Sequence, residues 1–111
     1  MATFVVMTAW VTAANPRGAS TDAQCSHLAE IAEVQPSTTE GCEDCLREGT
    51  QWVHLRECLE CGHVACCDNS PRRHATAHWH ATEHPIMRSF EPGEDWGWCY
   101  PDNLVLVPRT A

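Results

Sequence analysis

The sequence contains no lysine, so its positive charge comes from seven arginines, against fifteen aspartates and glutamates. The net charge of −8 is unfavourable for binding nucleic acids and anionic membrane surfaces, which attract proteins through their phosphate groups. We therefore expect neither as a partner.

Long hydrophobic runs are also missing. The mostly apolar residues 1–14 are too few to cross a bilayer as a helix, and they lack the positively charged start of a secretion signal. We interpret residues 1–20 as a leader, either disordered or added to the fold as a strand near residues 4–7. The remaining residues, 21–111, form one predicted domain.

Recognisable catalytic patterns are lacking as well. The sequence shows neither a Ser/His/Asp arrangement nor a glycine-rich phosphate loop, and nearly every cysteine and histidine fits a metal site instead. We therefore expect that the protein is not an enzyme.

Cysteine, by contrast, is abundant, at eight of 111 residues. Two Cys-x-x-Cys pairs, Cys42/Cys45 and Cys58/Cys61, are followed by closely spaced histidines, a pattern typical of zinc sites and without a role in a disulfide framework. We predict bound metal rather than disulfides. Thiolate ligands imply a reducing compartment, so we expect a cytoplasmic protein.

A helix is predicted over residues 70–81, because Ser70 is a good N-cap and Pro71 a good first helical residue. His74 and His78 would then share one face of this helix. Structural zinc takes four ligands, so the sequence offers eight ligands for two zinc ions: Cys42, Cys45, Cys58, Cys61, Cys66, His74, His78 and His84.

A third zinc site is predicted from Cys25, His27 and Cys99, which supply three ligands. Asp102 lies where the second cysteine of a Cys-x-x-Cys pair would stand, and a carboxylate oxygen is an acceptable zinc ligand. We propose Asp102 as the fourth ligand. The alternative is a solvated turn residue, which would leave the fourth position open for metal chemistry.

One cysteine and three histidines remain outside the predicted sets of zinc ligands. Cys67 is either a small buried thiol or a redox-sensing thiol beside a metal site. We interpret His54 and His80 as polar surface residues, and His63 has no assigned role.

Short strands are predicted at 50–56, 64–66, 86–90, 96–100 and 104–107.

The order and spacing of these ligands, ending in Trp98-Cys99-Tyr100, resemble the UBP-type zinc finger of ubiquitin-specific proteases and of one histone deacetylase. The resemblance runs from Cys25 to Asp102 and is strongest to small stand-alone bacterial members. It implies an α+β fold, a small twisted antiparallel sheet with one main helix, cross-braced by three zinc ions. It also implies how the ligands divide: Cys25, His27, Cys99 and position 102; Cys42, Cys45, Cys66 and His74; Cys58, Cys61, His78 and His84.

The resemblance further implies a binding function, since this family is best known for holding the free C-terminal tail of ubiquitin. Trp98 and Tyr100 match aromatics of that binding pocket. The carboxylate-binding arginine is absent, because Cys67 and Asp68 follow the ligand Cys66. Candidates to replace it are Arg72 and Arg73.

We therefore predict a zinc-binding protein-interaction module with structural zincs, which recognises a peptide or protein C-terminal tail. One alternative is a zinc- or redox-responsive protein in which Cys67 or the third site is the labile element. The other is a zinc hydrolase, which would need an open metal position at the third site.

Overall fold

The computed structural model describes residues 10–109. Its main feature is a six-stranded antiparallel sheet with the strand order β1-β6-β5-β4-β2-β3. The strands are β1 (Trp10–Ala13), β2 (Leu55–Cys58), β3 (Val64–Cys66), β4 (Ile86–Ser89), β5 (Gly97–Cys99) and β6 (Leu104–Pro108). The predicted α+β fold is confirmed.

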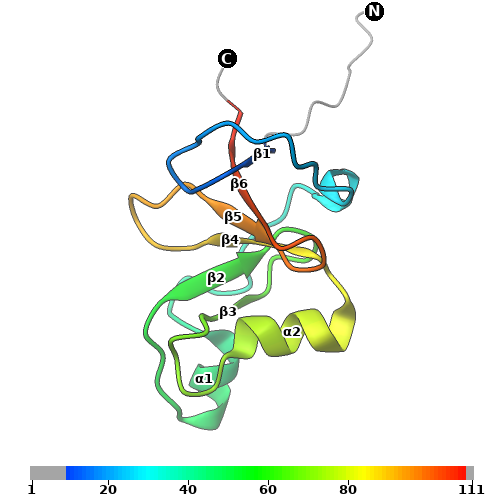
Figure 1. Cartoon of the computed structure of the whole chain (residues 1–111). Coiled ribbons are helices and arrows are strands. Elements are labelled where there is room, and N and C mark those ends of the chain that lie inside the picture. Colours follow the sequence, from blue (N-terminus) through cyan, green and yellow to red (C-terminus); the bar gives the residue numbers. More distant parts are fainter. Residues whose placement is uncertain (1–9, 110–111) are drawn as a thin grey trace, which may run out of the picture.

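Two α-helices pack at one end of this sheet. The main helix α2 (His74–Thr82) and the shorter α1 (Glu43–Glu48) lie beside β3, away from β1 and β6 (Figure 1). A 3-10 turn, η1 (Leu28–Glu30), lies in the segment between β1 and α1. The helices and the far strands therefore form two distinct regions of a small molecule.

The buried core is small and rich in cysteine. One buried cluster combines Leu59, Ile86 and Leu106 with two cysteines, Cys25 and Cys99. The other contains two alanines and three cysteines: Ala65, Ala75, Cys42, Cys45 and Cys66. A domain of about 100 residues with so few large apolar side chains inside gains much from additional cross-links.

The main helix begins three residues later than the sequence predicts, at His74 instead of Pro71. Ser70 does not cap it, because its hydroxyl accepts a hydrogen bond from the backbone N–H of Val53 at 2.9 Å. The N-cap residue is Arg73, in the left-handed region with φ 47° and without a side-chain cap bond. Instead, the N–H of His74 donates to Cys66 Sγ at 3.2 Å. The sulfur of a predicted metal ligand therefore accepts the first N–H of the helix.

The strand expected over 50–56 also starts later, at Leu55, whereas the strand expected at 64–66 has the predicted bounds. The strand suggested at residues 4–7 lies outside the described residues. Within them, Trp10–Ala13 pairs with β6, so the sheet extends into the segment interpreted as a leader. Among residues 10–109, no helix is long and apolar enough to cross a membrane.

Candidate metal centre

The structure brings twelve side chains together in three groups of four, each with its ligand atoms within 4.8 Å of one another. We call them site A (Cys42, Cys45, Cys66, His74), site B (Cys58, Cys61, His78, His84) and site C (Cys25, His27, Cys99, Asp102). The groups are those that the family resemblance implies. All eight cysteines lie within the described residues and are free thiols.

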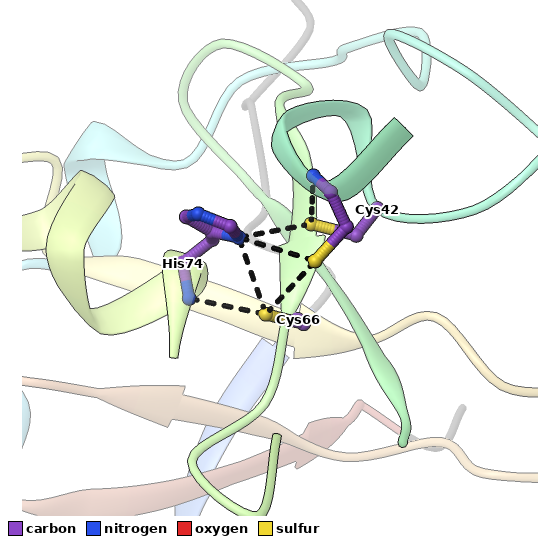
Figure 2. A group of neighbouring side chains, drawn as sticks. Cys42, Cys66 and His74 are labelled. Carbon is purple, nitrogen blue, oxygen red and sulfur yellow. Dashed lines mark hydrogen bonds between the residues drawn. The ribbon is translucent and has the colours of Figure 1, made fainter. Parts of the chain in front are cut away.

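Site A shows why the arrangement suits a metal. His74 Nδ1 faces all three sulfurs, at 3.5 Å from Cys42 Sγ, 3.4 Å from Cys45 Sγ and 3.5 Å from Cys66 Sγ (Figure 2). Cys45 Sγ and Cys66 Sγ are 3.9 Å apart. A ring nitrogen carries at most one proton, so it cannot hydrogen-bond three thiols in this way. Around tetrahedral zinc, S···N and S···S edges are about 3.5 and 3.8 Å, so the group fits zinc.

Local sequence places the two site A sulfurs of the first Cys-x-x-Cys pair. Cys42 is the N-cap of α1, and its sulfur accepts the N–H of Cys45 at 3.3 Å. The helix ends at Gly49, whose φ of 75° suits the left-handed C-terminal position. Glu48, in its last turn, has Oε1 at 3.2 Å from His74 Nε2. This carboxylate fixes the imidazole so that Nδ1 faces the site.

Site B repeats this design with two histidines. His84 Nδ1 lies 3.5 Å from Cys58 Sγ, and His78 Nε2 lies 3.4 Å from Cys61 Sγ. The N–H of Glu60 donates to Cys58 Sγ at 3.4 Å, and its Oε2 lies 3.4 Å from His84 Nε2. Glu60 therefore orients a ligand histidine as Glu48 does at site A.

The turn of site B depends on Gly62. Its φ is +83°, and a Cβ built there would lie 2.0 Å from the carbonyl oxygen of Gln35. Its N–H donates to the carbonyl of Cys58 at 2.8 Å, which closes the turn. No other residue type fits this position without backbone movement.

Site C joins distant parts of the chain. His27 Nδ1 lies 3.0 Å from Asp102 Oδ2 and 3.5 Å from Cys99 Sγ, and Cys99 Sγ lies 3.7 Å from the same carboxylate oxygen. Asp102 Oδ2 also accepts the N–H of Ser26 at 2.8 Å. Two thiols, an imidazole and a carboxylate are an acceptable zinc donor set. Asp102 thus lies among the other three predicted ligands.

Burial raises the pKa of several sulfur ligands. It raises the pKa of Cys42 and of Cys99 to about 12, and that of Cys58 to about 11. The thiols therefore keep their protons unless a cation stabilises the thiolates. Burial, followed by charge on His63, lowers the pKa of His78, which favours the neutral imidazole that a metal needs.

The side chains left over by the sequence analysis occupy different environments. His54 and His80 are exposed, as expected of surface residues. Cys67 is buried, with its sulfur 3.6 Å from the hydroxyl of Ser70. His63 is half-buried and contacts both α1 and site B, and no spacing in the sequence predicts these contacts.

A groove of about 270 Å³ opens beside the sheet, next to the start of α2. Its lining includes three aromatic residues, Trp96, Trp98 and Tyr100, together with Cys67 and Asp68. The three aromatic residues are half-buried. They therefore line a groove, where the sequence left open whether they would fill the core instead.

Arg56, which the sequence analysis did not select, is the one cationic residue among the described residues lining this groove. Its guanidinium carbon lies 4.7 Å from the ring centre of Trp96, and one of its nitrogens donates to the carbonyl of Leu55 at 2.9 Å. Arg72 and Arg73 are exposed and do not line the groove; Arg72 Nε lies 3.7 Å from a Glu48 carboxylate oxygen.

Comparison with known proteins agrees with this geometry. Residues 42–108 match the family described as "Zn-finger in ubiquitin-hydrolases and other protein". A Rhodopseudomonas palustris protein solved by solution NMR is 52% identical, with 79% of this chain and 85% of that chain covered and a TM-score of 0.71. The comparison with curated proteins finds no match. Since the family match spans more than half of the chain, the protein belongs to the zinc-finger family found in ubiquitin hydrolases and other proteins.

Proposed function

We propose that this zinc finger is a protein-interaction module that binds the C-terminal tail of a peptide or protein in the groove lined by Trp98 and Tyr100. The observation that carries the proposal is Arg56, a cation held against Trp96 inside this aromatic groove. An arginine fork is well suited to hold a carboxylate through two hydrogen bonds.

The zincs have a structural role in this proposal. Twelve Cys, His and Asp side chains from loops, strands and helices meet in groups of four, which is the number of protein ligands that a structural zinc takes. The four-ligand grouping at site C, with Asp102 in it, argues against the hydrolase alternative. When bound, zinc cross-links these segments and stabilises the thiolates.

Contacts with α2 restrain the side chains that line the groove. The rings of Tyr100 and Trp79 stack with centres 5.7 Å apart and planes 3° from parallel, which ties the groove wall to α2. Burial raises the pKa of Tyr100, so its hydroxyl stays neutral as a hydrogen-bonding group. Asp68, which would repel a bound carboxylate, accepts a 2.6 Å hydrogen bond from Thr76 Oγ1. This bond holds one of its oxygens toward α2.

Arg56 takes the role that the sequence analysis offered to Arg72 and Arg73. Its bond to the carbonyl of Leu55 uses one nitrogen, and a guanidinium has five N–H donors. The stacking on Trp96 restrains the plane of the fork, so less rotamer entropy is lost when a ligand binds.

Isothermal titration of the zinc-loaded protein tests the proposal, with a short peptide ending in a free Gly-Gly and its C-terminally amidated twin. We expect the free acid alone to bind, and Arg56→Gln to weaken it by about 10- to 100-fold, as loss of a charge-assisted bond does. Arg72→Gln is the matched control and should bind normally. Equal binding of both peptides, or binding of neither, would contradict carboxylate recognition.

A redox-responsive role is the second candidate, because Cys61 is the one exposed sulfur among the described ligands. Cys67 adds to it: although burial acts in the opposite direction, hydrogen bonds from Ser70 and from backbone N–H groups lower its pKa. Mild peroxide treatment separates the two proposals. Zinc release at low oxidant, prevented by Cys67→Ser, would favour the redox role. We propose a cytoplasmic location for either role, since both need reduced thiols.

A further inference from the structure

His63 lies between two metal sites without belonging to either. It follows the Cys58/Cys61 pair, and its carbonyl accepts the N–H of Cys58 at 2.9 Å. Its side chain is 17% exposed. By its backbone, His63 is therefore part of the turn that presents the sulfurs of site B.

The ring of His63 contacts a ligand of that site directly. It stacks on the ring of His78, with centres 4.6 Å apart and planes 15° from parallel. His78 Nε2 in turn faces Cys61 Sγ at 3.4 Å. The position of the His63 ring thus restricts how the imidazole of His78 can turn toward the metal.

Both ring nitrogens of His63 are held by the helix of site A. Nδ1 lies 2.7 Å from Glu43 Oε2, and Nε2 lies 2.6 Å from Asp44 Oδ2. The two acidic residues lie in the first turn of α1, between the site A ligands Cys42 and Cys45. Each ring nitrogen of His63 therefore lies within hydrogen-bonding distance of a carboxylate oxygen of α1.

We propose that His63 is a positioning residue that couples site A to site B, so that zinc held at one site is retained better when the other is filled. α1 fixes the ring, and the ring fixes His78. Outer-shell partners of metal ligands commonly change metal affinity by about 10- to 100-fold. Here a single side chain would act on two sites, through its nitrogens at one and its face at the other.

The test compares zinc loss from the three sites after addition of a chelator. The imidazole nitrogen resonances of His74, His78 and His27 report sites A, B and C separately. His63→Phe keeps an aromatic ring over His78 but removes both hydrogen bonds to α1. His54→Phe, at an exposed histidine, is the matched control.

We expect His63→Phe to speed zinc loss from sites A and B by about tenfold, while site C stays within about twofold of the wild type. A double change, Glu43→Gln with Asp44→Asn, should have the same effect and keeps the proposal testable if His63→Phe folds poorly. Arg47→Gln removes the other partner of Asp44 and should leave all three rates unchanged.

Three results would overturn the coupling. Equal acceleration at all three sites would show that His63 only stabilises the fold. Faster loss from site B alone would show that the hydrogen bonds to α1 hold the ring over His78 without supporting site A. Unchanged rates would show that neither contact matters for zinc retention. None of these results depends on whether the groove binds a peptide.

Discussion

Sites A and B differ from site C in how the protein supports them. At sites A and B, the carboxylates of Glu48 and Glu60 contact the outer ring nitrogens of ligand histidines. His63 contacts both sites, through Asp44 at site A and His78 at site B. Site C uses a carboxylate ligand, and its Asp102 and His27 side chains are 25% and 28% exposed. The helical region is thus organised around two mutually supporting sites, whereas site C joins segments that are far apart in the sequence.

The largest effect should come from removing a ligand of the paired sites. Cys58→Ser leaves site B one thiolate short, and structural zinc contributes about 10 kcal/mol or more to folding. We expect loss of the cooperative thermal transition and of zinc from both A and B, measured by circular dichroism melts and metal analysis. A melting curve like that of the wild type would contradict a structural role for site B.

A smaller and more local effect is expected at site C. Asp102→Asn should remove one zinc of three while the sheet and α2 stay folded, because sites A and B do not depend on Asp102. Native mass spectrometry counts the metals, and circular dichroism checks the fold. Asp102→Cys is the matched opposite change, and should bind the third zinc more tightly because it adds a thiolate. Three zincs retained by Asp102→Asn would mean that the carboxylate is not a ligand.

The sites should also differ in the protons that they release on binding zinc. Burial raises the pKa of Cys42 to about 12. The resulting contribution to the stability of the metal-free fold is complete below the ordinary thiol pKa of 9.0 and is lost as the pH rises from 9.0 to about 12. Zinc must displace such protons, so its affinity rises with pH.

Site A, with three thiols, should therefore show a steeper pH dependence than site C, with two. Asp102 adds no proton at neutral pH, since a backbone hydrogen bond from Ser26 lowers its pKa. The contribution of the ionised Asp102 side chain to folding stability is complete above the ordinary carboxyl pKa of 3.8. This contribution is lost as the pH falls through the lower pKa of the folded state. Titration calorimetry in buffers of different ionisation enthalpy measures the proton count, and equal counts would contradict the comparison.

The smallest effect is expected at Cys67, next to a site A ligand. Cys67→Ser replaces a buried thiol that contacts Ser70 and faces no predicted metal site. We expect a loss of about 1 kcal/mol or less and unchanged zinc content, from melting curves and metal analysis. Zinc loss similar to that of Cys66→Ser would show that Cys67 is a ligand after all.

Cysteine and histidine spacing in the sequence predicted the candidate ligands, and the family resemblance implied how they divide into three groups of four, the groups that the structure brings together. Alternation and β-rich composition predicted most strands. The sequence predicted the start of the main helix wrongly, since Ser70 bonds to Val53, a contact between distant segments. It also missed α1, although two acidic residues in the first turn, Glu43 and Asp44, and a glycine at position 49 were visible signals.

The roles of Arg56 and His63 could not be predicted in the same way. Each role depends on which elements lie side by side in the fold. A single arginine or histidine forms no motif in the sequence that would identify such a role. Arg56 lines the groove because β2 lies beside β4 in the sheet. His63 reaches α1 because the two Cys-x-x-Cys turns pack against each other.

The sequence distance between ligands has a consequence for the order of assembly. Cys58 and His84 of site B are 26 residues apart, whereas His27 and Asp102 of site C are 75 apart. Closing the longer loop in an unfolded chain costs about 1 kcal/mol more in entropy. We therefore expect the nascent chain to capture zinc first near its middle, and to anchor β1 and β6 last, once the segments on either side of that nucleus have met.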